Sequence, residues 1–129
     1  MPDSYRDLRV WQQAMKLAVR IYRETEAFPK HELYSLTAQL RRAAVSVPSK
    51  IAEGKGRRTD PDFLNFLFHA RGSLLELETQ VSLAQQLGYL AEFSAKSLLR
   101  DTAGTGSALT GLIHSLKAVG CAKTAASGR

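Results

Sequence analysis

The residues best suited to chemistry in this sequence are cations, and they are concentrated in one stretch. Residues 41–58 read RRAAVSVPSKIAEGKGRR and hold six Lys or Arg side chains against one acidic residue, Glu53, a local charge of +5. The whole 129-residue chain carries a formal charge of +6, so the basicity is local. Clustered cations bind phosphate groups, but cations near a helix end also stabilise the helix dipole without any ligand. The stretch is therefore a candidate nucleic-acid-binding surface, with a solvated helix end as the alternative.

Residue types that carry catalysis or bind metals are scattered along the chain. His31, His69 and His114 lie on three different segments, and none has a second ligand at the spacing that helical metal sites use. Glu76 and Glu78 are two residues apart and point to different faces of a helix, which favours ion pairing over acid–base catalysis. A single cysteine excludes an internal disulfide and a zinc site built on cysteines. We expect no enzyme activity, no cofactor and no metal.

The elements that position these residues are predicted to be helices. Apolar residues make up 44% of the chain, which is ordinary for a globular protein, and they recur at three- and four-residue spacings with no strand-like alternation. The predicted helices run from about Tyr5 or Leu8 to Ala27, from between His31 and Leu36 to Gly54, from Asp60 to Leu87, and from about Ala91 to Ala118. The pattern predicts an all-α fold, an antiparallel up-down-up-down four-helix bundle. We expect one domain over residues 1–118 and a disordered tail over 119–129.

Several positions make more specific predictions. The apolar period continues through Pro48, which predicts a second helix kinked at the proline rather than two helices. Asp60 is the expected N-cap of the third helix, with Pro61 at its first position, and Gly88 is the expected stop. The apolar stripes of the first and third helices are broader than one seam needs, which predicts either a thick core or self-association.

The targeting signals that would place the chain in or across a membrane are not found. No apolar run approaches the ~18 residues of a membrane span, and the first residues hold no apolar core of a signal peptide. The basic residues cluster at a helix end instead of lining a face opposite bulky apolar groups, which disfavours membrane-surface binding. We expect a cytoplasmic protein with no membrane partner.

Four separated motifs together resemble the four-helix bundle proteins of the 23S rRNA intervening-sequence family. They are YRDLRVWQQA at 5–14, FPKHE at 28–32, LTAQLRRAAVSVPSKIAEG at 36–54, and ARGSLLELETQ at 70–80 followed by LGYL at 87–90. The resemblance implies a ring-shaped homopentamer and kinship with the accessory variability determinant of diversity-generating retroelements, whose members resemble basic barrels that bind nucleic acid and a reverse transcriptase. Lys50 and Ser35 depart from the family pattern, which usually has Asn and Gly there. Lys50 adds a positive charge.

These observations predict a non-enzymatic, oligomeric helical bundle that binds RNA or DNA electrostatically. The alternative is a protein-interaction scaffold that docks a protein partner on its faces. Because the basic stretch holds no aromatic residue, stacking on unpaired bases is not expected. The candidate nucleic-acid-binding residues are Arg41, Lys50, Lys55, Arg57 and Arg58. The candidate structural or assembly residues are Trp11, Arg42, Pro48, Glu53, Gly72, Glu76 and Glu78.

Overall fold

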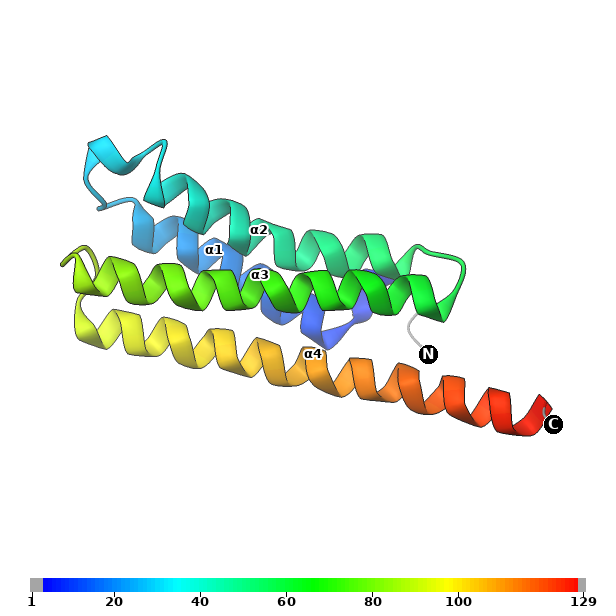
Figure 1. The fold of residues 1–129 in the computed structure, drawn as a ribbon. Coiled ribbons are helices and arrows are strands. Elements are labelled where there is room, and N and C mark those ends of the chain that lie inside the picture. Colours follow the sequence, from blue (N-terminus) through cyan, green and yellow to red (C-terminus); the bar gives the residue numbers. More distant parts are fainter. Residues whose placement is uncertain (1–3, 128–129) are drawn as a thin grey trace.

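The regular structure of the chain is entirely helical within residues 4–127, which the computed structural model describes, with side chains described for residues 4–120. The prediction of an all-α fold is therefore confirmed. Two short 3-10 helices precede α1 and α2 (Figure 1). In chain order the elements are η1 (Tyr5–Asp7), α1 (Arg9–Thr25), η2 (Lys30–Glu32), α2 (Leu36–Lys55), α3 (Asp60–Gln86) and α4 (Glu92–Ser127).

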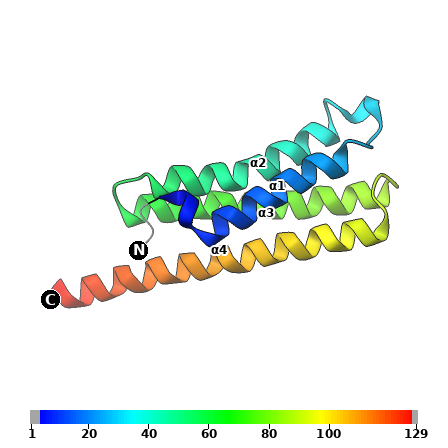
Figure 2. The same cartoon turned by 180° about the vertical axis from the view of Figure 1, so that it is seen from behind.

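The four long helices form a bundle around one core. Helix α2 packs against both α1 and α3, α3 packs against α4, and α4 closes the bundle against α1. The chain reverses direction at each connection, so each helix runs opposite to the next (Figures 1 and 2). The C-terminal end of α2, the start of α3 and the N-terminal 3-10 helix therefore lie at one end of the bundle, and η2 lies at the other.

The core contains apolar rows at the three- and four-residue spacings that predicted the helices. On α3 a row of apolar residues that alternate four and three residues apart, which we call the heptad row, is buried along its whole length: Phe63, Leu67, Ala70, Leu74, Leu77, Val81 and Ala84. The broad apolar stripe of α1 consists of two rows, of which one is buried and the other is only partly buried. The buried row is Val10, Ala14, Leu17 and Ile21. In the neighbouring row Met15 and Tyr22 are 39% and 44% exposed, so the excess apolar surface of α1 lies outside the core of the subunit.

The first turn of α3 begins one residue earlier than the sequence suggested. Thr59, not Asp60, is the N-cap: its backbone is extended, and its Oγ1 accepts a hydrogen bond of 3.3 Å from the backbone N–H of Asp62. Asp60 is the first helical residue, where its carboxylate complements the helix dipole. Either residue type can cap a helix, so the choice between adjacent candidates depends on backbone angles that the sequence does not specify.

Helix α3 ends just before Gly88, as the sequence predicts. Gly88 has a φ of +82°, a left-handed conformation that glycine adopts without strain. Its N–H donates to the carbonyl of Gln85, and the N–H of Tyr89 donates to the carbonyl of Ala84, which is the Schellman pattern. Leu90 then turns into the core, where it is 6% exposed.

Helix α2 continues through Pro48 as a single helix, and Pro48 is buried within it. The proline has no N–H to donate to the carbonyl of Ala44; a kink at this position stays a prediction.

Helix α4 extends beyond the predicted domain end at residue 118. Among the side chains described up to residue 120, its last buried core residue is Ile113, and the helix continues to Ser127, past the α2–α3 connection (Figure 1). We expected a disordered tail at residues 119–129, and the side chains from residue 121 onward lie outside the described residues. The division into a domain at 1–118 and a separate tail therefore stays a prediction.

Candidate nucleic-acid interface

Four of the five candidate binding residues gather at one end of the bundle. Lys50 and Lys55 lie on the last turns of α2, and Arg57 and Arg58 lie in the connection to α3. The two arginines are exposed and the two lysines are half-buried. We refer to these four residues as the four-cation cluster.

The four-cation cluster has one described acidic partner. This ion pair joins Lys50 Nζ of the cluster to Glu53 Oε1 at 3.6 Å. This is an exposed i,i+3 pair, and such pairs are weak and screened by salt. The other described ion pairs within residues 4–120 do not include Lys55, Arg57 or Arg58. Four cations against this one described partner leave the cluster with a net positive charge.

An aromatic ring from α3 lies beneath the cluster. The guanidinium carbon of Arg57 is 4.6 Å from the ring centroid of Phe66, and Lys50 Nζ is 5.7 Å from it. Both distances are typical of cation–π contacts. The basic stretch itself holds no aromatic residue, because Phe66 lies on the next helix. In the sequence, Phe66 is recognisable only as an apolar residue beside the heptad row of α3.

The absence of a side chain at Gly54 permits this arrangement. A Cβ atom at Gly54 would lie 2.8 Å from Phe63 Cδ1 and 2.8 Å from Phe66 Cβ. Carbon atoms without a bond between them are most stable at about 3.5–4.0 Å. The end of α2 and the start of α3 can therefore approach closely only with glycine at this position, and that approach brings Phe66 to Lys50 and Arg57.

Arg41, the fifth candidate, lies apart from the cluster. Nine residues of helix separate it from Lys50, which is about 14 Å along the axis. Its guanidinium lies 4.7 Å from the ring centroid of Tyr22, and its Nε donates to Thr25 Oγ1 at 2.9 Å. Both partners belong to α1. These contacts make Arg41 a link between α1 and α2, so we do not include it in the binding surface.

Two of the candidate assembly residues, Arg42 and Glu76, line one polar groove between α2 and α3. The groove has a volume of about 270 Å³. Inside it Ser73 Oγ donates to Ser46 Oγ at 2.9 Å, and Gln80 Oε1 is buried without a described hydrogen-bond partner. No ion pair between Arg42 and Glu76 is described.

The other candidate acid and the candidate glycine of α3 lie outside that groove. Glu78 is half-buried. Gly72 is exposed in the interior of α3, and a Cβ atom there would meet nothing within 4 Å. Nothing within the described subunit therefore requires glycine at position 72.

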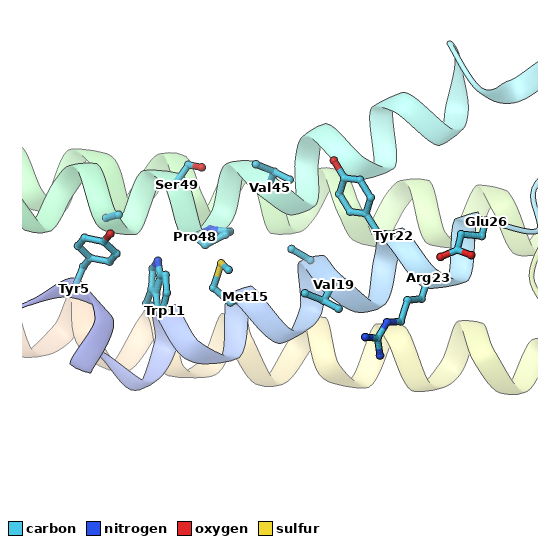
Figure 3. Close-up of a pocket in the computed structure, with 12 residues that line it drawn as sticks. Tyr5, Trp11, Met15, Val19, Tyr22, Arg23, Glu26, Val45, Pro48 and Ser49 are labelled. Atoms are coloured by element: carbon cyan, nitrogen blue, oxygen red, sulfur yellow. The ribbon is translucent and has the colours of Figure 1, made fainter.

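A larger, apolar groove lies between α1 and α2. Its volume is about 650 Å³, and it includes the candidate assembly residues Trp11 and Pro48. Figure 3 shows Trp11, Met15 and Val19 of α1 on one side, facing Val45 and Pro48 of α2. Met15, Val19 and Val45 are each about two-fifths exposed, at 39%, 44% and 41%. This apolar groove is the surface that the exposed row of α1 creates.

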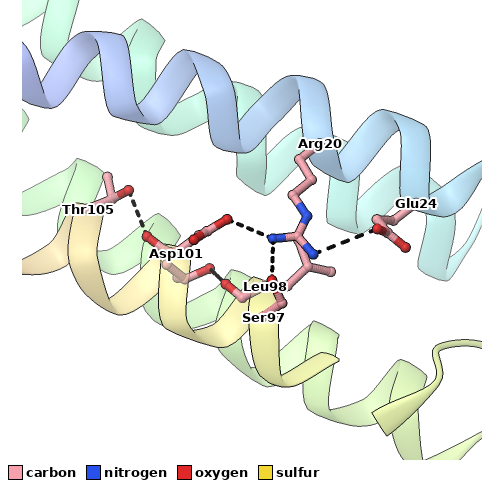
Figure 4. Close-up of polar contacts among 7 residues, drawn as sticks. Arg20, Glu24, Ser97, Leu98, Asp101 and Thr105 are labelled. Atoms are coloured by element: carbon pink, nitrogen blue, oxygen red, sulfur yellow. Dashed lines mark hydrogen bonds and ion pairs between the residues drawn. The ribbon is translucent and has the colours of Figure 1, made fainter. Parts of the chain in front are cut away.

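A polar network joins α1 to α4 on another side of the bundle. Arg20 Nη1 is 2.7 Å from Asp101 Oδ2 and donates to Ser97 Oγ at 2.8 Å, while its Nη2 is 3.8 Å from Glu24 Oε2 (Figure 4). The side chain of Arg20 is 27% exposed, so this multiply bonded guanidinium is partly shielded from water. Its role is to hold α1 and α4 together.

The clearest electrostatic perturbation lies at the end of the bundle opposite the four-cation cluster. The hydroxyl of Tyr89 donates to Glu32 Oε2 at 2.9 Å, and the backbone N–H of Leu36 donates to Glu32 Oε1 at 3.3 Å. The bond from Tyr89, and then that from Leu36, lower the pKa of Glu32 below its usual value. The same carboxylate raises the pKa of Tyr89. This pair fastens η2 to the α3–α4 connection.

The described residues form neither a metal-binding cluster nor a membrane-spanning helix. No group of three or more His, Cys, Asp or Glu side chains is placed to hold a metal ion. No helix in this part of the chain is long and apolar enough to cross a membrane.

Comparison with known proteins gives one family and one fold. The sequence profile described as 23S rRNA-intervening sequence protein matches residues 6–111. A solved structure from Bacteroides thetaiotaomicron, described as a protein of unknown function from the S23 ribosomal protein family, is 22% identical to this chain. It superimposes with a TM-score of 0.73 over 81% of this chain and 97% of its own. At that identity the likeness supports the fold alone. No curated protein matches the sequence.

Proposed function

This chain belongs to the 23S rRNA-intervening sequence protein family, and from that premise we propose that it is a non-enzymatic, oligomeric protein that binds RNA or DNA through the four-cation cluster. The observation that carries the proposal is the gathering of Lys50, Lys55, Arg57 and Arg58 at one end of the bundle, with one described acidic partner among them. The family description refers to 23S rRNA, which supports a nucleic-acid ligand.

The chemistry of the cluster favours contacts with phosphates over contacts with base edges. Exposed Lys and Arg side chains displace counterions from the nucleic-acid backbone, which produces affinity that falls steeply with salt and depends little on sequence. The cluster lies on a helix end and a short connection instead of along the face of one helix. We therefore propose electrostatic binding without strong sequence preference, by a protein that acts in the cytoplasm.

Self-association is the second part of the proposal, and the apolar groove between α1 and α2 supports it. On the outward side of α3 the same chain exposes Leu75, at 60%, and Leu83, at 46%. A groove and an apolar ridge on different faces of one subunit suit a head-to-tail contact, which produces a ring when the rotation between neighbouring subunits closes. Gly72 lies on this ridge with open space above it, where a helix of a neighbouring subunit can approach closely. A homopentamer is the size that we propose, and each added subunit multiplies the positive charge.

The apolar groove also favours the alternative function, a scaffold for a protein partner. A helix of another protein, bearing apolar residues on one face, would bury Trp11, Met15 and Val19 as a second copy of this chain would. The two functions differ in what fills the groove of the pure protein. A protein that oligomerises through the groove supports the first proposal, whereas a monomer with an open groove favours the scaffold.

The test of nucleic-acid binding compares two variants with the same change in net charge. One variant replaces Lys50, Lys55, Arg57 and Arg58 by Ala. The matched control replaces four cations elsewhere on the surface, namely Lys16, Lys30, Lys96 and Arg100. Fluorescence anisotropy at low salt, with labelled RNA and labelled DNA, measures affinity. We expect the first variant to lose binding and the control to retain most of it. Equal losses in both would mean that net charge, not the cluster, attracts the nucleic acid.

A further inference from the structure

Phe66 and His69 add two rings to the four-cation cluster. Phe66 is half-buried and His69, one turn later on α3, is exposed. Their ring centroids are 6.2 Å apart with an interplanar angle of 66°, an edge-to-face contact. Arg57, exposed above Phe66, contributes a planar guanidinium 4.6 Å from the ring centroid. Three flat groups and the neighbouring lysines therefore share one small, solvent-facing area.

We propose that this area binds unpaired nucleobases, so that the preferred ligand is single-stranded RNA or DNA rather than a duplex. The inference rests on the proposed function, because it specifies the ligand of the same cluster. Aromatic rings and Arg guanidinium planes stack on bases, and adjacent cations neutralise the phosphates on either side. A base in a duplex is already stacked on its neighbours and its faces are not accessible, so a duplex gains only the phosphate contacts.

The packing of the site supports a platform of fixed position. The close approach at Gly54 holds Phe66 against the end of α2, and the partial burial of Phe66 limits its motion. A ring that is held in place loses little conformational entropy when a base stacks on it. The flanking cation, Arg57, lies in the four-residue connection between α2 and α3, where its side chain can shift to admit a base.

A second ring on α3 provides an internal comparison. Phe68 is also half-buried and also has two cations over its ring, Arg71 at 5.0 Å and Lys117 at 5.2 Å. It lies two residues from Phe66, so it faces a different side of α3, towards Lys117 of α4. Phe68 therefore offers the same local chemistry outside the four-cation cluster.

The experiment measures the affinity of the full chain for a single-stranded oligouridylate and for an RNA duplex of equal length, by fluorescence anisotropy. We expect the wild-type protein to bind the single strand more tightly. Phe66→Leu should lower single-strand affinity about tenfold, within the range for losing one stacked base, and leave duplex affinity unchanged. Phe66→Tyr, which keeps an aromatic ring, should bind the single strand with wild-type affinity. Phe68→Leu should leave both affinities unchanged.

The outcomes separate this inference from the proposed function. Wild-type binding with no preference for the single strand, or equal losses for both ligands in Phe66→Leu, overturns the inference but not the proposed function. No wild-type binding to either ligand at low salt overturns both. His69→Ala alters an exposed side chain, so it tests the inference even if Phe66→Leu fails to fold. It should lower single-strand affinity by a smaller factor, and unchanged affinity would count against the inference.

Discussion

Replacing Gly54 by Ala tests the close approach that shapes the candidate interface. The new Cβ atom would lie 2.8 Å from Phe66 Cβ, an atom fixed to the backbone of α3, and 3.3 Å from the carbonyl oxygen of Phe63. Relief to ordinary carbon–carbon contact needs a separation of α2 and α3 of about 0.7 Å or more. The ring of Phe63 can turn aside, but the backbone of α3 cannot move without disturbing the core row beside it.

The expected change in the free energy of unfolding has two opposing parts. Overpacking of this kind costs about 1–3 kcal/mol, while replacing glycine by alanine inside a helix returns about 1 kcal/mol. Gly72→Ala is the matched control, because the space around Gly72 is open within the subunit and only the second effect applies there. We therefore expect Gly72→Ala to stabilise the protein by about 1 kcal/mol, and Gly54→Ala to be less stable than this control by about 1–3 kcal/mol.

Thermal unfolding followed by circular dichroism provides the measurement. One kcal/mol corresponds to about 4 °C in Tm for a chain of this size. Light scattering should establish that the two variants have the same oligomeric state, since Gly72 lies on the proposed subunit interface. The reasoning would be refuted if Gly54→Ala were as stabilising as Gly72→Ala, because α2 and α3 would then not depend on the missing side chain.

Three further predictions concern the residues that hold the bundle and its partners together. Tyr89→Phe should destabilise the protein at neutral pH by removing a hydrogen bond that lowers the pKa of Glu32. A carboxylate with a lowered folded pKa contributes stability above its unfolded pKa, near 4.5, so the difference from wild type should shrink as denaturation is measured at lower pH; a constant difference would contradict this. Arg41→Ala should lower Tm by about 4 °C, because it removes about 1 kcal/mol of contacts to α1. The same variant should leave nucleic-acid affinity unchanged. A tenfold loss of affinity would show that Arg41 belongs to the binding surface. Val19→Glu should dissociate the oligomer in light scattering and preserve the helical circular dichroism, and a variant that stays oligomeric would show that the apolar groove is not the subunit contact.

The parts of the fold that could be predicted from the sequence are those set by local periodicity. The buried row of α3 follows from seven apolar residues that alternate four and three residues apart, and Gly88 stops the helix through its own backbone preference. The broad apolar stripe of α1 was recognisable in the sequence, but which of its residues are buried and which are exposed was not. Which of two adjacent apolar rows enters the core depends on where α2 and α4 pack, and Met15 was left outside.

The candidate site shows the same limit more sharply. Arg41 and Lys50 belong to one basic stretch of sequence, yet helical geometry separates them by about 14 Å, and Arg41 binds α1 instead. Phe66 belongs to another helix, yet it contacts both Lys50 and Arg57. Proximity in the sequence therefore grouped Arg41 with cations that lie far from it, and it did not reveal the contact of Phe66 with Lys50 and Arg57. Contacts between helices depend on how the helices pack, which the spacing within one helix does not determine.

The slope of binding affinity against salt concentration tests the central claim most directly. Each phosphate contact made by a cation contributes about 0.7 for single strands and 0.9 for duplex DNA to the slope of log affinity against log salt. If all four cations of the cluster contact phosphates, replacing Lys50, Lys55, Arg57 and Arg58 by Ala should flatten the slope by about 3 for a single strand. The control variant at Lys16, Lys30, Lys96 and Arg100 should keep the wild-type slope. The same slope in both variants and in the wild type would contradict the account, because the cluster would then make no contact with the nucleic acid.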